Sequence, residues 1–292
     1  MKKLNNRYQL LLFFLIALAL SWSIWIPMVL DRLNIIQFKI PIILGQTIGA
    51  LGPLITLFIL NKASNGALGI KEIFDSIRIK GEKTIWLFPA ALTIPVLTIA
   101  GNILYYFVGI ESQLNILNPE AVELFGYGLI GVIPLVIFVY LLSSPLFEEP
   151  CWRGYGLGKL QEMFGRELGS LLLGTYWWLW HQPINIANGL EVSLYSYLLM
   201  LSHSFITDSF YNLSNKNLLS AMFVHSSLIM TFNFIYQSKN VFVLVMFLIG
   251  IFTLRILEWR RKKESRSFKQ QEIPIQPESS LYRQNTRNSN LK

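Results

Sequence analysis

The chain has 292 residues, of which 53% are hydrophobic and 14% are charged, with a mean hydropathy of +0.45. This composition excludes an ordinary soluble domain and predicts a polytopic membrane protein. The single cysteine, Cys151, excludes an intrachain disulfide framework and a cysteine-rich metal site. The formal net charge of +8 predicts basic segments at an anionic membrane surface, with no nucleic-acid partner.

Apolar runs of the length that crosses a bilayer, roughly 20 helical residues, occur about eight times along the chain. They lie near residues 8–30, 40–60, 86–108, 126–146, 168–187, 193–210, 218–236 and 241–257. The first follows Lys2, Lys3 and Arg7 and lacks a small-residue cleavage site, so we expect an uncleaved anchor. The predicted fold is an all-α membrane bundle of about eight transmembrane helices.

The charged segments between the spans predict the orientation of the bundle, because cytoplasmic loops of membrane proteins are enriched in lysine and arginine. Residues 62–83 carry five lysines and arginines, whereas residues 109–124 carry three glutamates and neither lysine nor arginine. The basic cluster at residues 260–263 follows the last span. We therefore expect a plasma-membrane protein with both termini in the cytoplasm, which requires an even number of crossings.

Two segments outside the spans have their own predictions. Residues 61–81 place apolar side chains at helical spacing among lysines, which is typical of an amphipathic helix on the inner membrane surface or of a helix packed on the bundle. Both interpretations are open. Residues 260–292 are basic and polar, which predicts a disordered cytoplasmic tail after a transmembrane domain at residues 1–259.

Three charged residues, Glu148, Glu149 and Arg153, follow directly on a long apolar run. Charges at membrane depth are costly, so they usually pair and indicate function. At about 100° per residue, Arg153 lies about 40° from Glu149 and about 140° from Glu148 around a helix. We therefore expect a Glu149–Arg153 ion pair and a free Glu148 that faces a cavity as a general base. Pro145 and Pro150 are expected to kink this helix.

Two of the three histidines, His181 and His225, lie inside apolar runs. Neutral imidazoles that converge with a glutamate can hold and polarise a water, or ligate a metal that does so. The third, His203, is expected to make a hydrogen bond between packed helices. Cys151 is an unfavourable nucleophile, because two adjacent carboxylates oppose thiolate formation.

Three motifs, taken together, resemble those of a known family. The first is a glutamate pair followed by three residues and an arginine, the second is an aromatic residue four before a histidine, and the third is a histidine in a third helix. This family is the CAAX protease and bacteriocin-processing family, also labelled CPBP or Abi, which includes the type II prenyl-protein proteases. The resemblance covers residues 141–231, with further matches in "GYGL" and "WHQP". It implies an intramembrane endopeptidase of the metalloprotease class that acts on a hydrophobic or prenylated peptide or protein in the bilayer.

Carried over by position, the resemblance implies that Glu148 is the catalytic glutamate and that Glu149 and Arg153 complete the first motif. His181 matches the histidine of the second motif and His225 that of the third. The family's glutamate and histidines are interpreted either as ligands of a divalent metal such as zinc or as a metal-free pair that activates water. Both interpretations are open for this chain.

The chain departs from the family at two positions. Trp177 replaces the usual phenylalanine of the second motif, and Ile229 replaces the usual asparagine four residues after His225. Removing an oxyanion donor typically costs about 2.7 to 4 kcal/mol in the barrier, and isoleucine has no donor. Asn233 or Ser226 are candidate substitutes.

The loss of the asparagine motivates an alternative function. The chain would then be a non-catalytic peptide-binding membrane protein, for example one that confers bacteriocin immunity. A proton-coupled transporter that uses the same glutamate and histidines is a third hypothesis. It is less favoured, because the sequence contains no evident internal repeat.

Overall fold

The computed structural model describes residues 6–66, 68–77, 79, 81–126, 143–236 and 238–271. The chain divides into two units, Met1–Leu254 and Arg255–Lys292. Within the described residues the secondary structure is helical, apart from an isolated antiparallel bridge between Leu117 and Ile235. The predicted all-α class is therefore confirmed.

The described residues form α-helices of different lengths, together with a 3₁₀ helix and a π-helix. They are α1 (Asn6–Arg32), α2 (Ile42–Ala50), α3 (Gly52–Ala63), α4 (Ile70–Asp75), the 3₁₀ helix η1 (Gly81–Trp86), α5 (Leu87–Phe107), α6 (Pro119–Gly126), α8 (Ser144–Glu149), the π-helix η3 (Pro150–Leu157), α9 (Gly158–Phe164), α10 (Arg166–Ala187), α11 (Leu194–Leu213), α12 (Leu218–Phe234) and α13 (Val241–Gln271).

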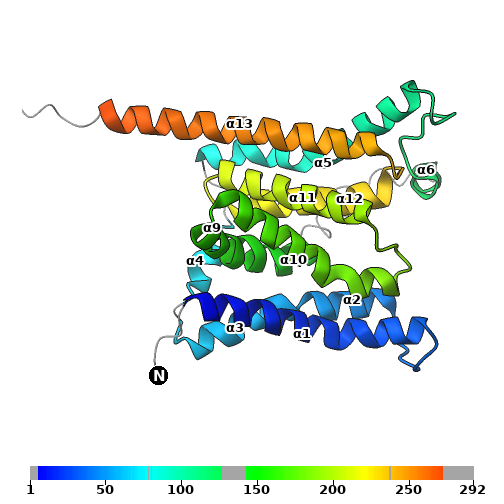
Figure 1. Cartoon of the computed structure of the whole chain (residues 1–292), viewed down its shortest axis with the longest axis horizontal. Helices are drawn as coiled ribbons and strands as arrows, with labels where there is room; N and C mark the ends of the chain where they lie inside the picture. The colour runs from blue at the N-terminus through cyan, green and yellow to red at the C-terminus, as the bar shows by residue number, and fades with distance from the viewer. Residues whose placement is uncertain are drawn as a thin grey trace, which may run out of the picture. The chain divides into compact units, whose positions relative to one another are not determined.

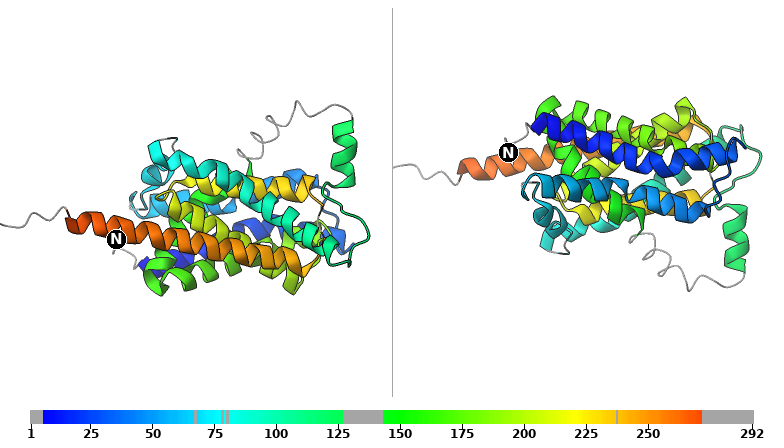
Figure 2. Two further views of the ribbon diagram at one scale, coloured as in Figure 1. Left: turned by 90° about the horizontal axis from the view of Figure 1, so that it is seen from above. Right: turned by 90° about the horizontal axis from the view of Figure 1, so that it is seen from below.

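The long helices of the first unit pack side by side in an order that differs from their order in the chain. Helix α1 packs against α2 and α3 and also against α10, α10 packs against α11, α11 against α12, and α12 against α5. Figures 1 and 2 show the axes of these helices running in roughly one direction. The short α8 and η3 contact α12, α10 and α11, so their side chains lie inside this bundle.

Among the residues that the structure describes, four helical stretches are long and apolar enough to cross a membrane: Arg7–Arg32, Ile42–Ala63, Thr84–Phe107 and Val241–Glu264. Helix α12 is apolar but has 17 residues. Helices α10 and α11 have 22 and 20 residues but carry many polar side chains. The span predicted at residues 126–146 falls mostly outside the described residues. The chain is thus a helical membrane protein, and the number of eight spans stays a prediction.

The short helix α4 decides between the two interpretations of residues 61–81. Ile73 is buried, and its Cγ2 would lie 2.7 Å from a Cβ atom placed on Gly154. The missing side chain of Gly154 therefore admits Ile73, and α4 packs on η3. The packed helix, rather than a helix on the membrane surface, is the arrangement observed.

The second unit corrects part of the predicted tail. Helix α13 continues without a break to Gln271, so residues 260–271 are helical rather than disordered. The remaining residues of the tail, 272–292, lie outside the described part of the chain.

Candidate active site

The backbone that carries Glu148 and Glu149 is not broken by its two prolines. Pro145 lies in the first turn of α8, where a missing N–H costs nothing. Pro150 cannot form the α-helical bond to the residue four before it, and the chain continues from this point as the π-helix η3. One proline therefore begins the helix and a wider turn accommodates the other, and the kink expected at these positions stays a prediction.

Glu149 and Arg153 form the predicted ion pair. Arg153 Nη1 lies 3.1 Å from Glu149 Oε1, and neither side chain is exposed to solvent. The guanidinium also lies over the ring of Trp177, 5.0 Å from its centroid. A buried charge needs such compensation, because its desolvation costs several kcal/mol.

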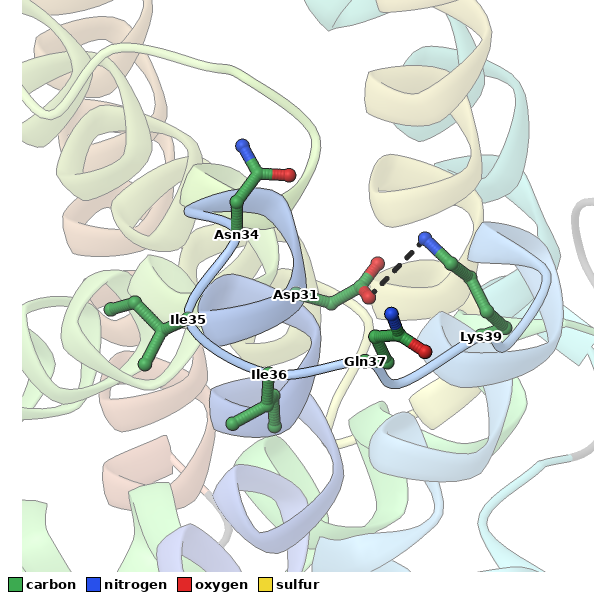
Figure 3. A pocket seen from close by; sticks show the side chains of 6 residues that line it. All are labelled: Asp31, Asn34, Ile35, Ile36, Gln37 and Lys39. Atoms are coloured by element: carbon green, nitrogen blue, oxygen red, sulfur yellow. Dashed lines mark ion pairs between the residues drawn. The ribbon is translucent and has the colours of Figure 1, made fainter.

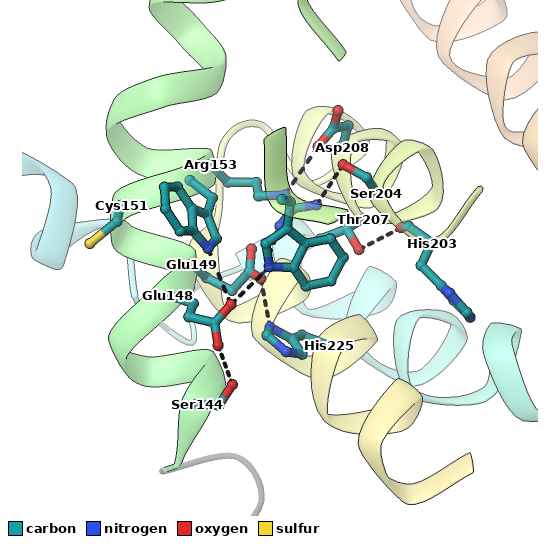
Figure 4. A network of polar contacts seen from close by, with 12 residues as sticks. Ser144, Glu148, Glu149, Cys151, Arg153, His203, Ser204, Thr207, Asp208 and His225 are labelled. Carbon is teal, nitrogen blue, oxygen red and sulfur yellow. Dashed lines mark hydrogen bonds and ion pairs between the residues drawn. The ribbon is translucent and has the colours of Figure 1, made fainter. Parts of the chain in front are cut away.

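Helix α11 supplies two partners of Arg153 that the motifs did not predict. Arg153 Nε donates to Asp208 Oδ1 at 3.1 Å, and Nη2 donates to Ser204 Oγ at 3.0 Å. Figure 4 shows both side chains facing the guanidinium from the same helix. The sequence feature that could have predicted this contact is Asp208, because an ionisable residue in an apolar helix is usually paired or functional.

His225 joins the cluster through Glu149. Its Nδ1 lies 2.8 Å from Glu149 Oε1, which also accepts the bond from Arg153. A carboxylate only accepts hydrogen bonds, so Nδ1 carries the proton and Nε2 presents a lone pair in the neutral ring. Glu149 therefore sets the tautomer of His225.

Glu148 is buried, with 1% of its surface exposed, and it is not free as predicted. Its Oε1 accepts a hydrogen bond from Ser144 Oγ, as Figure 4 shows. Its Oε2 accepts bonds from the indole nitrogens of Trp152 at 3.1 Å and Trp177 at 2.9 Å. The spacing predicted correctly that Arg153 pairs with Glu149, but it did not predict these three neutral donors.

Trp177 also connects Glu148 to both histidines. His181 Nδ1 lies 2.8 Å from the Trp177 carbonyl oxygen, so this ring too carries its proton on Nδ1 and presents Nε2 as an acceptor. The ring centroids of His181 and His225 each lie 5.3 Å from that of Trp177. The side chains of the three motifs thus meet around one indole.

A divalent metal was one of two options for this cluster. Among the described residues, no three His, Cys, Asp or Glu side chains form a group that could hold a metal ion. Both oxygens of Glu148 are already hydrogen-bonded to protein donors. The metal-bound and the metal-free interpretations of this cluster both stay predictions.

Four further polar residues belong to the same segment of the chain. Asn233 is exposed, and its Nδ2 donates to the Ile229 carbonyl at 2.8 Å, so the structure does not bring it to the cluster. Ser226 is buried beside His225 on α12. His203 packs edge-on against Phe247 and points away from the carboxylates (Figure 4). The thiol of Cys151 also points away and donates to a backbone carbonyl.

A separate polar pocket lies at the connection between α1 and α2 (Figure 3). It contains an ion pair between Asp31 and Lys39, 3.4 Å apart, and Asp31 also accepts a bond from the Phe38 amide. The lining residues are Asp31, Asn34, Ile35, Ile36, Gln37 and Lys39. None of them belongs to the three motifs.

Comparison with known proteins agrees with the motifs. Residues 130–231 match the family described as Type II CAAX prenyl endopeptidase Rce1-like. A protein of Methanococcus maripaludis named CAAX prenyl protease 2 is 42% identical over 53 residues, which is 18% of this chain. The matched part spans 19% of that relative's length. The resemblance to the CAAX protease family, predicted from the three motifs, is therefore confirmed for the segment that contains all five predicted catalytic residues.

Proposed function

We propose that the protein is an intramembrane endopeptidase that hydrolyses a peptide bond with a water activated by Glu148. The observation that carries the proposal is the meeting of buried Glu148 with His181 and His225 around Trp177. The first motif lies in α8 and η3, the second in α10 and the third in α12. All three lie in the segment that is similar to CAAX endopeptidases. The substrate class is a hydrophobic or prenylated peptide or protein in the membrane.

In the proposed mechanism Glu148 takes a proton from the water while the water oxygen attacks the scissile carbonyl carbon. The unprotonated Nε2 atoms of His181 and His225 orient the water, one of them by accepting a hydrogen bond from its second hydrogen. The C–N bond then breaks, and Glu148 returns its proton to the leaving amine. No metal takes part in these steps.

Glu149 and Arg153 hold this arrangement without reacting. Glu149 keeps the proton of His225 on Nδ1, which leaves Nε2 available to the water. Arg153 compensates the buried charges of Glu149 and Asp208. The protein is proposed to act in the plasma membrane with both termini in the cytoplasm, which the basic residues after the last span support.

The proposal is tested by cleavage assays on the protein purified in detergent. The substrates are a farnesylated peptide with a CAAX end, its unprenylated copy, and a library of apolar peptides. We expect the native protein to cleave at least one of these substrates in ¹⁸O-labelled water and to place one label in the new carboxyl group. His181→Asn and His225→Asn are expected to lower kcat by about 10²-fold or more, because each removes an imidazole that orients the water.

The absence of cleavage by the native protein in every substrate class would contradict the proposal. Incorporation of ¹⁸O that is unchanged in both histidine variants would contradict the assigned site. The thermal unfolding midpoint of each variant is the control, since a lost fold would also remove activity.

A second function is favoured by Ile229, which stands where the family has an amide. The chain would then bind and sequester a peptide, as a bacteriocin-immunity protein does, without cutting it. Under this hypothesis peptide binding depends on the shape of the site around Glu148 and does not depend on its proton transfer.

The variant Ile229→Asn distinguishes the two proposed functions. An amide one turn after His225 is expected to raise kcat by about 10²-fold, the effect of one oxyanion donor. Ile229→Leu is the matched apolar control and is expected to leave kcat unchanged. Activity in Ile229→Asn but none in the native protein would support the binding function, and equal activity in both would show that position 229 contributes no donor.

A further inference from the structure

We infer that Oε1 of Glu148 is the oxygen that receives the proton of the water, and that Trp152, Trp177 and Ser144 are positioning residues that impose this choice. The inference rests on the proposed function, because it assigns roles around the same carboxylate. The motifs give no role to the indoles or to the hydroxyl.

The first step concerns Oε2. A carboxylate oxygen has two lone pairs, and the indole N–H groups of Trp152 and Trp177 occupy both at 3.1 and 2.9 Å. An indole nitrogen donates and never accepts. A proton on Oε2 would therefore face two donors without an acceptor, so protonation of Oε2 is unfavourable.

The second step concerns the rigidity of the two indoles. Trp152 and Trp177 are fully or almost fully buried. Trp152 packs edge-on against aromatic rings of α1 and α10, and Trp177 is held between the guanidinium of Arg153 and the two histidine rings. The donors are in place before any substrate arrives, which is the property that makes an active-site dipole effective.

The third step concerns Oε1. Ser144 is the donor on this oxygen, which leaves one lone pair for the proton of the water. A hydroxyl can both donate and accept, so Ser144 donates to the carboxylate and, after a rotation, accepts from the carboxylic acid. Ser144 therefore accommodates a proton on Oε1, whereas the two indoles exclude a proton from Oε2 and donate to that oxygen in both protonation states of Glu148.

The geometry is tested without a substrate by NMR of the eight tryptophan indoles in the ¹⁵N-labelled protein in detergent. Single Trp→Phe variants assign the signals. We expect Glu148→Ala to shift the indole N–H signals of Trp152 and Trp177 upfield, because both lose a charged acceptor. The signal of Trp178, which is adjacent in α10 but donates to Ser196, is expected to stay in place. Unmoved signals of Trp152 and Trp177 would overturn the inference, even if the native protein cleaves peptides.

The roles are tested by kinetics on a cleaved peptide. Trp177→Phe and Trp152→Phe are expected to lower kcat about 10- to 100-fold at unchanged KM, the range for a hydrogen bond to a charged group, whereas the control Trp178→Phe keeps kcat. Ser144→Ala is expected to lower kcat about 10-fold, whereas Ser144→Thr, which keeps the hydroxyl, is expected to have the kcat of the native protein. Equal losses in Trp177→Phe and Trp178→Phe, or in Ser144→Ala and Ser144→Thr, would overturn the assignment. A native protein that cleaves nothing would instead contradict the proposed function, with the NMR result unaffected.

Discussion

Replacing Glu148 with glutamine is expected to lower kcat for peptide cleavage by about 10²- to 10⁴-fold, the usual contribution of a general base. Glutamine keeps the shape of the side chain, and its carbonyl oxygen still accepts bonds from Trp152 and Trp177. It cannot take a proton from water. The loss should therefore fall on kcat, with KM and the unfolding midpoint almost unchanged, as measured by initial rates and thermal unfolding in detergent.

The matched control is Glu162→Gln, which makes the same chemical change at an exposed position of α9. Its activity should equal that of the native protein. Glu148→Asp adds a second comparison, because the carboxylate remains but retreats by one methylene from the indoles and from Ser144. Full activity in Glu148→Gln would exclude Glu148 as the base and favour the binding function.

Replacing Arg153 with methionine is expected to lower the free energy of unfolding by about 3 to 5 kcal/mol, the range for one partner removed from a buried ion pair. Methionine fills much of the same volume but leaves the carboxylates of Glu149 and Asp208 without their shared cation. Arg153→Lys should recover only part of this loss, because an ammonium group cannot serve three acceptors in the fork geometry of a guanidinium. Denaturant titration in mixed micelles measures the free energy of unfolding of each variant.

A double-mutant cycle identifies the origin of that loss. Adding Asp208→Asn to Arg153→Met removes one stranded charge, so the double variant should be more stable than Arg153→Met alone. Lys239→Met, which removes an exposed cation paired with Glu191, serves as the surface control and should change stability little. Arg153→Met as stable as the native protein would mean that the buried cluster does not depend on this charge.

Contacts within one helix were predictable from the sequence. Glu149 and Arg153 are four residues apart, and helical periodicity places them on one face. The same spacing relates Ser144 to Glu148, Glu148 to Trp152, and Ser204 to Asp208. The rule that predicted the ion pair places each of these pairs on one face of a helix. Helical spacing could not predict that the chain accommodates Pro150 with a π-helix.

The sequence by itself determined the membrane class, the all-α class and the three motifs to which we assign the proposed chemistry, because hydropathy and helical spacing are local properties. Only the tertiary structure decided that His225 donates to Glu149, that Trp177 donates to Glu148 and that Asp208 shares Arg153. These partners are 76, 29 and 55 residues apart. Periodicity states which side chains share a face of one helix, but the packing of α10, α11 and α12 around η3 determines which faces meet, and that choice follows from the fit of the whole bundle.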